Sequence, residues 1–256
     1  MPTILLRAEP GDRPPDVLLV EDPEDAERAA SFLDGGQGRS NLISDHRGLP
    51  SFSGRWSGHP VTIQTTGLGA PAVAMIVEEL LMIGARRFVR VAPAMAVAPR
   101  LRLGGTIVVL AASATDGTSR TLLGRQQVAP VGDFALADAL VQAAQAAGVD
   151  VDVGSVATVD VLPDAVQRAE LAAHGVLAAD LGTAPLFVLA ARGDARRPPD
   201  GARIRAAALL WIDQLATVEG SRPDDPGPEG LLRIALDVLS GPQASGCLTA
   251  KVDAGR

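Results

Sequence analysis

The sequence predicts an α/β fold, a three-layer α/β/α sandwich around a mixed central sheet. Short apolar runs rich in β-branched residues alternate with helix-like stretches from one end of the chain to the other. The chain has 256 residues, of which 47% are hydrophobic, which is enough for one α/β domain with a full core. We therefore expect a single domain over residues 1–256, with partly loose ends at about 1–15 and 240–256.

The predicted strands are short runs in which apolar and β-branched residues predominate. We expect strands at residues 17–20, 60–65, 87–91, 106–111, 151–156, 175–179 and 204–212.

The predicted helices lie between these runs, at residues 23–33, 71–83, 133–147, 166–173, 184–191 and 229–239. Asp22 is the expected N-cap of the first, with Pro23 at its first position. The second is nearly apolar apart from Glu78 and Glu79, so we expect it to be buried on several sides. Polar stretches at 194–201 and 221–227 are expected to be loops.

Composition excludes several classes of function. Twenty-three basic and 30 acidic residues leave a net charge of −7, which argues against a nucleic-acid partner. The single Cys247 excludes an intrachain disulfide, and three scattered His make a zinc site improbable, so no metal or cofactor is expected. No apolar run approaches the roughly 20 residues of a membrane helix. Without a leader of the secretory type, we expect a cytoplasmic protein.

A Gly-x-Gly-x-x-Ala stretch, Gly67 to Ala72, joins a predicted strand to a predicted helix. Dinucleotide binding would need an acidic residue at the end of the next strand, where the chain has Ala92-Pro93-Ala94. A tight turn that requires glycine is the simplest interpretation. A different ligand at the same helix end stays open.

Other charged residues suggest a site less specifically. Asp213 follows a long apolar strand, at the sheet edge where ligands of α/β proteins gather, and is either a proton donor or a surface acid. Arg90 ends a strand and Arg47 lies in a polar turn, and each is suited to bind an anion. Five carboxylates lie within Glu21–Glu27. Complementation of a helix dipole is a better interpretation of them than a cation site.

Several stretches follow one another in an order that is itself informative. They are Ala8-Glu9-Pro10-Gly11-Asp12, residues 17–28, residues 47–54, Thr66-Gly67-Leu68-Gly69, Val77-Glu78-Glu79-Leu80, Phe88-Val89-Arg90-Val91, Pro130-Val131-Gly132-Asp133-Phe134, Ala179-Asp180-Leu181-Gly182 and Ile212-Asp213. In this order they resemble the purine nucleoside phosphorylase and uridine phosphorylase family, over about residues 5–239.

The resemblance implies a sandwich with a mixed, partly barrel-like sheet, and cleavage of an N-glycosidic bond by phosphate or water. It implies active sites near a dimer interface, to which a neighbour lends an Arg and a His, and hence a dimer-built homo-oligomer, up to a hexamer, that binds a small molecule. Asp213 and Arg90 are the implied catalytic residues. The implied substrate-binding residues are Gly67, Leu68, Gly69, Arg47, Leu162, Asp180, Leu181 and Gly182.

The departures from the family pattern are informative. Glu21 stands where the family has the glycine that cradles phosphate, and Asp25 where it has the arginine that clamps it. Ala92 and Pro93 replace a Gly and a Ser or Thr, Gly182 replaces the glutamate that holds the ribose, and the lent His is Leu5. With Asp25 in place of an arginine, a bound phosphate at about 4 Å meets a repulsive charge instead of an attractive one. This exchange weakens phosphate binding by roughly 10–1000-fold.

Three hypotheses follow. The first is a repurposed enzyme that acts on a nucleoside-like or other small molecule without ordinary phosphorolysis. Hydrolysis of an ordinary nucleoside is not expected either, because Gly182 cannot hold a ribose. The second is a non-catalytic homologue that binds a ligand or completes the site of an active relative. The third is a true phosphorylase whose phosphate is held by Arg86, Arg87 or Arg120. An open pocket would favour an enzyme, whereas a site filled by side chains such as Leu181 and Met95 would favour the second hypothesis.

Overall fold

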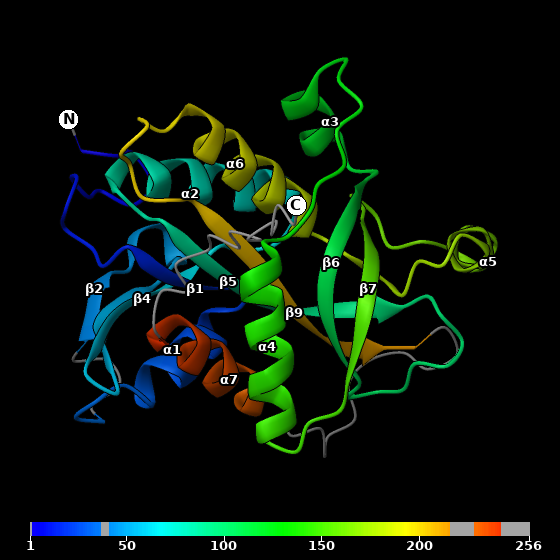
Figure 1. Cartoon of the computed structure of the whole chain (residues 1–256), viewed down its shortest axis with the longest axis horizontal. Helices are drawn as coiled ribbons and strands as arrows, with labels where there is room; N and C mark the ends of the chain where they lie inside the picture. Colours follow the sequence, from blue (N-terminus) through cyan, green and yellow to red (C-terminus); the bar gives the residue numbers. More distant parts are fainter. Residues whose placement is uncertain (1, 37–40, 216–227, 242–256) are drawn as a thin grey trace, which may run out of the picture.

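The computed structural model describes residues 2–36, 41–215 and 228–241 of the chain, and its centre is a nine-stranded mixed sheet (Figure 1). The strand order is β2-β3-β4-β1-β5-β8-β7-β6-β9, and β9 pairs back with β5. Five strands thus close into a ring, which confirms the partly barrel-like sheet. The strands are β1 (Asp16–Val20), β2 (Leu42–Ser44), β3 (Ser51–Trp56), β4 (His59–Thr65), β5 (Arg87–Ala96), β6 (Thr106–Ala114), β7 (Val151–Thr158), β8 (Ala178–Asp180) and β9 (Arg205–Gln214).

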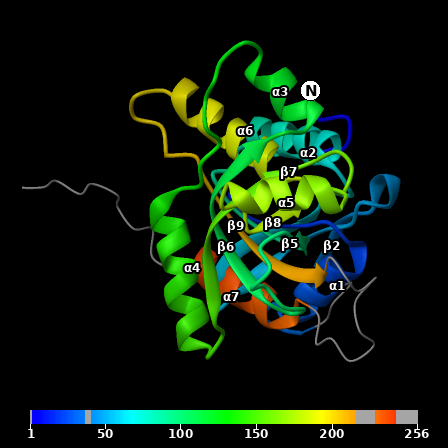
Figure 2. The same ribbon diagram turned by 90° about the vertical axis from the view of Figure 1, so that its right-hand side faces the viewer.

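Helices cover both faces of this sheet, which confirms the three layers (Figures 1 and 2). One core cluster lies between the sheet and α2 and α6, and the other between the sheet and α1, α4 and α7. The helices are α1 (Pro23–Ser31), α2 (Ala70–Ile83), α3 (Gly117–Leu123), α4 (Phe134–Ala146), α5 (Ala165–Ala173), α6 (Thr183–Arg196) and α7 (Glu229–Ser240). No helix among the described residues is long and apolar enough to cross a membrane.

Strand β5 is the centre of the sheet. It pairs in parallel with β1 and β9 and in antiparallel with β8. The carboxyl ends of β1, β5 and β9 therefore lie at one edge of the sheet, where ligands of α/β folds gather. This edge brings together residues that are far apart in the sequence.

The structure corrects some of the predicted elements. Strand β8 covers only Ala178–Asp180, because Gly175 (φ 78°) still belongs to the turn that ends α5. Strand β2 was not predicted because it has only three residues, and strand β3 and helix α3 were not predicted because their sequences are polar and contain glycine. Helix α6 continues to Arg196, into the stretch predicted as a loop. The other predicted loop, 221–227, lies outside the described residues.

The N-terminal segment, expected to be partly loose, is held against α2. The Glu79 carboxylate accepts hydrogen bonds from the backbone N–H groups of Ile4, Leu5 and Leu6, at 2.8–3.0 Å. The buried Arg13 guanidinium donates to Ser51 Oγ, Gln64 Oε1 and the Leu6 carbonyl oxygen. The segment is therefore tied both to α2 and to the β3–β4 pair.

We expect Glu79→Ala to release this segment. Losing hydrogen bonds to a charged acceptor is expected to lower the free energy of unfolding by about 1–2 kcal/mol. It is also expected to speed hydrogen exchange at residues 4–6. Glu78→Ala, at the neighbouring exposed position, is the matched control. Equal exchange rates in both variants would contradict the role of Glu79.

Candidate functional site

Arg90 is a charged side chain in the middle of the central strand. It lies on β5 between Leu19 of β1 and Ala208 of β9, and it is 0% exposed. Its neighbours on the same face of β5, Phe88 and Ala92, belong to the core beneath α2 and α6. A guanidinium there must be paired, because an isolated buried charge is strongly destabilising.

Two carboxylates neutralise this guanidinium. Glu21, directly after β1, forms a short contact with Arg90 Nη2, and Asp180, at the end of β8, lies 3.2 Å from Nη1. Glu21 is 5% exposed and Asp180 is 1% exposed. Arg90 Nε has no hydrogen-bond partner among the described residues. We call these three residues the Arg90 cluster.

Asp180 is held in place from all sides. It accepts hydrogen bonds from Thr158 Oγ1 (2.7 Å), from the N–H groups of Gly182 and Thr183 (3.1 and 2.8 Å) and from Thr183 Oγ1 (2.6 Å). These amides form the first turn of α6, whose dipole favours a negative charge. Asp180 thus holds the N-terminus of α6 and binds Arg90 at the same time.

Glu21 is in the opposite situation, since it has one strong partner and several repulsive neighbours. Burial raises the pKa of Glu21, the Arg90 guanidinium acts against this, and the charges of Asp180 and Asp213 raise it further. Asp213, on β9, is therefore an electrostatic neighbour of the cluster. The edge of the sheet holds three carboxyl groups against one guanidinium.

The Gly67–Gly69 turn joins β4 to α2 beside the end of β1. Gly67 and Gly69 have φ values of 74° and 88°, which only glycine adopts without strain. Thr66 ties the turn to β1, because both its N–H and its hydroxyl donate to the Val20 carbonyl oxygen. Leu68 is 73% exposed at the tip. The arrangement matches the predicted tight turn.

Comparison with known proteins identifies the family of this fold and site. The model of the phosphorylase superfamily matches residues 15–196. The chain belongs to the phosphorylase superfamily. The chain is 32% identical over 229 residues to the DeoD-type purine nucleoside phosphorylase of Jannaschia sp. (strain CCS1), covering 87% of this chain and 92% of that protein. It is 34% identical over 155 residues to the uridine phosphorylase of Thermococcus kodakarensis, covering 60% of this chain and 54% of that protein.

Within the superfamily fold, the chain leaves no room for a side chain at position 182. A Cβ added to Gly182 would lie 2.7 Å from Val73 Cγ2 and 3.0 Å from Arg90 Nη2. The Arg90 guanidinium therefore packs directly on the Gly182 backbone. The glutamate that the resemblance places here does not fit beside Arg90 as it is held in this chain.

The other predicted site residues lie further toward the surface. Leu181 and Met95 are half-buried, and neither closes the site by itself. Arg47 is exposed in a short 3-10 turn with φ 60°, and Leu162 is 39% exposed in the loop before α5. Sequence reasoning missed Thr158 and Thr183, because nothing in the sequence marks them as ligands of Asp180.

The acidic run at 21–27 divides into separate roles. Asp22 caps α1 by accepting from the Glu24 N–H at 2.8 Å, as predicted. Asp25 pairs with Arg28 at 3.1 Å, and burial raises the pKa of Asp25 to about 6. Across the described residues, no group of three or more His, Cys, Asp or Glu side chains is arranged to hold a metal ion.

We expect Gly182→Ala to destabilise the protein by about 1–3 kcal/mol, because the new methyl group overpacks Val73 and the buried guanidinium. Thermal and urea denaturation measure the change. Gly230→Ala is the control, since a Cβ there, on α7, meets nothing within 4 Å. That variant is expected to be neutral or stabilised by up to about 1 kcal/mol. A tolerated Gly182→Ala would contradict the tight packing.

Asp25 predicts a pH dependence of stability. The pKa of Asp25 is raised in the folded state, so the protonated carboxyl group adds to the free energy of unfolding. This contribution is fully present below about pH 4 and is lost as the pH rises through about 6. We expect Asp25→Asn to be more stable than the wild type at pH 7.5, by roughly 1 kcal/mol after screening. The two proteins should converge near pH 4. The exposed Glu24→Gln is the control, and a constant difference between pH 4 and 8 would refute the assignment.

Proposed function

We propose that this chain acts on a nucleoside-like small molecule without using phosphate as the attacking group. The observation that carries the proposal is the buried ion pair between the Glu21 carboxylate and the Arg90 guanidinium. The anion-binding group of the cluster is already neutralised from within the chain. Superfamily membership and the nucleoside phosphorylases among the relatives support the substrate class.

The charges near the cluster support the exclusion of phosphate. A doubly charged anion would meet the carboxylates of Glu21, Asp180 and Asp213 around one guanidinium that two of them already bind. Each like-charge pair at 4 Å costs about 4 kcal/mol near a protein surface. Asp25 is the residue that the resemblance places where the family has a phosphate-clamping arginine.

The groups that remain are suited to hydrolysis. Asp213 is partly exposed at the sheet edge, and we propose it as the proton donor. The oxygen of a water would bond to C1′ of the sugar while the bond from C1′ to the base nitrogen breaks. The departing base would take its proton from Asp213, and the proton lost by the water would go to solvent. The backbone N–H groups of the Gly67–Gly69 turn would stabilise developing negative charge.

The burial of the cluster favours a second candidate, a non-catalytic homologue. Arg90, Asp180 and Glu21 are almost fully shielded, so a bound molecule cannot reach them without rearrangement. Such a chain would bind a ligand or complete the site of an active relative, and Arg47 is exposed as that role requires. Exposed apolar side chains at Ile4, Leu68, Met75 and Met82 support assembly, and we propose a homo-oligomer.

The deciding experiment incubates the protein with a panel of purine and pyrimidine nucleosides, in buffer with and without phosphate. Chromatography measures the free base that is released. The proposal predicts release in phosphate-free buffer, no increase on adding phosphate, and a loss of at least 100-fold in Asp213→Asn. Phosphate-dependent release would overturn it. Release in neither buffer, with nucleoside binding retained, would establish the non-catalytic candidate.

A second test removes the internal carboxylate. Glu21→Gly leaves Arg90 with Asp180 alone, so we expect a destabilisation of about 3 kcal/mol in buffer without phosphate. Phosphate should then raise the melting temperature of this variant more than that of the wild type, because an anion replaces the lost partner. Glu24→Gly, at an exposed position of the same run, is the control. Equal phosphate effects in all three proteins would contradict the role of Glu21.

A further inference from the structure

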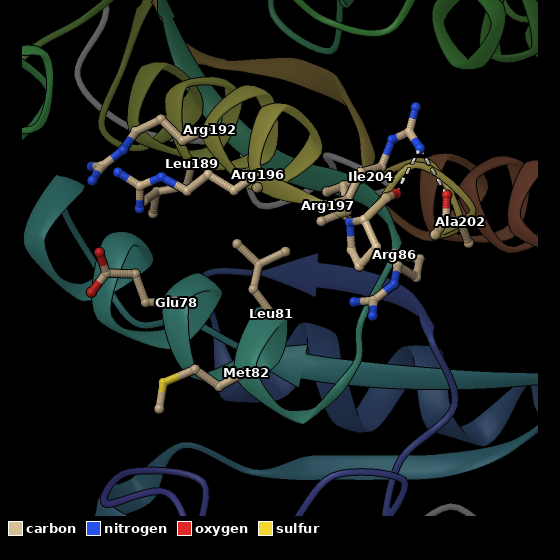
Figure 3. Close-up of a pocket in the computed structure, with 13 residues that line it drawn as sticks. Glu78, Leu81, Met82, Arg86, Leu189, Arg192, Arg196, Arg197, Ala202 and Ile204 are labelled. Atoms are coloured by element: carbon tan, nitrogen blue, oxygen red, sulfur yellow. Dashed lines mark hydrogen bonds between the residues drawn. The ribbon is translucent and has the colours of Figure 1, made fainter.

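A pocket of about 450 Å³ lies between the outer surfaces of α2 and α6 and the chain that follows α6 (Figure 3). Its volume is in the range of small-molecule sites. The lining consists of Glu78, Leu81, Met82, Arg86, Leu189, Arg192, Gly193, Arg196, Arg197, Pro198, Gly201, Ala202 and Ile204. It shares no residue with the Arg90 cluster.

The charge of this pocket is opposite to that of the chain. Four arginines and one glutamate line it, whereas the whole chain has a net charge of −7. The four arginines do not have the same role. Arg197 is occupied, because it binds Asp194 at 2.8 Å and donates to the Pro198, Pro199 and Gly201 carbonyl oxygens, which shapes the loop.

Arg192 and Arg196 are the arginines available for a ligand. They are four residues apart on α6, so they project from one face, where two like charges repel each other. Figure 3 shows their guanidinium groups side by side at the end of the pocket where Glu78 lies on α2. No carboxylate of the described chain forms an ion pair with either arginine. Arg86 uses one nitrogen on the Ala85 carbonyl oxygen, at 2.8 Å.

The rest of the wall is apolar. Leu81 lies between the pair Arg192 and Arg196 at one end and Arg86 and Arg197 at the other. The side chains of Leu189 and Ile204 also line the pocket. Two adjacent guanidinium groups match a doubly charged anion, which they bind through parallel N–H···O bonds. The apolar wall matches an organic group attached to that anion. Glu78 is the one acidic group of the lining and opposes anion binding.

From these observations we propose that the α2–α6 pocket binds a phosphate monoester with an apolar body, through Arg192 and Arg196. This site is separate from the Arg90 cluster and does not depend on the proposed function. Its ligand is bound and not cleaved.

Calorimetric titration of the full chain with phenyl phosphate and with inorganic phosphate tests the proposal. Both should bind, phenyl phosphate about tenfold more tightly because its ring is buried on Leu81 and Ile204. The double variant Arg192→Gln, Arg196→Gln should bind at least tenfold more weakly. Glu78→Gln should bind more tightly, by a few-fold.

Arg100→Gln is the matched control, because Arg100 is exposed and pairs with Asp152 on β7, away from the pocket. It should bind phenyl phosphate as the wild type does. The absence of binding, or equal affinities for the wild type and the double variant, would overturn the proposal. An equal loss of affinity for phenyl phosphate in Arg100→Gln would show that any surface positive charge contributes, and would also overturn the proposal. Asp213→Asn should keep the binding, which separates this result from failure of the proposed hydrolysis.

Discussion

The positive charge of Arg90 in the middle of the sheet is the constraint on which the site depends. A buried guanidinium must be neutralised, and only carboxylates brought by other strands can reach it. Glu21 comes from β1 and Asp180 from β8, so the charge joins three strands at one edge. Asp180 also accepts hydrogen bonds from the first N–H groups of α6, so the position of that helix is coupled to the pairing of Arg90. Gly182 follows as a consequence, since the guanidinium occupies the space of its missing side chain.

This constraint also limits the chemistry of the site. A guanidinium that already holds two carboxylates has little affinity left for a free anion, and burial keeps water from screening the surrounding acids. The superfamily fold is present with its sheet edge and glycine turn, and we propose that its polar groups are arranged for a ligand without a phosphate. Arg192 and Arg196 of the α2–α6 pocket lie on the outside of the helical layer, where no carboxylate of the described residues forms an ion pair with them.

Much of the fold followed from pattern alone. Strands such as β1 and β9 read as largely apolar runs, and Asp22-Pro23 marked the start of α1, because these signals are local. Strand β3 was missed because its sequence, Ser51–Trp56, lies toward the sheet edge and carries polar residues on its partly solvated part. The early end of β8 depended on how Gly175 turns after α5, which no apolar pattern reveals. The N-terminal segment is ordered by Glu79, a contact across more than 70 residues.

The sequence by itself determined the fold class and the family resemblance, because periodicity and motif order are properties of neighbouring residues. It predicted Arg90 at the end of a strand, whereas β5 continues to Ala96 and places Arg90 in its middle. Only the tertiary structure decided that Glu21 and Asp180 both bind Arg90, and that four arginines from α6 and its surroundings share a pocket. Those facts depend on the distances between side chains from different strands and helices, which chain folding alone brings together.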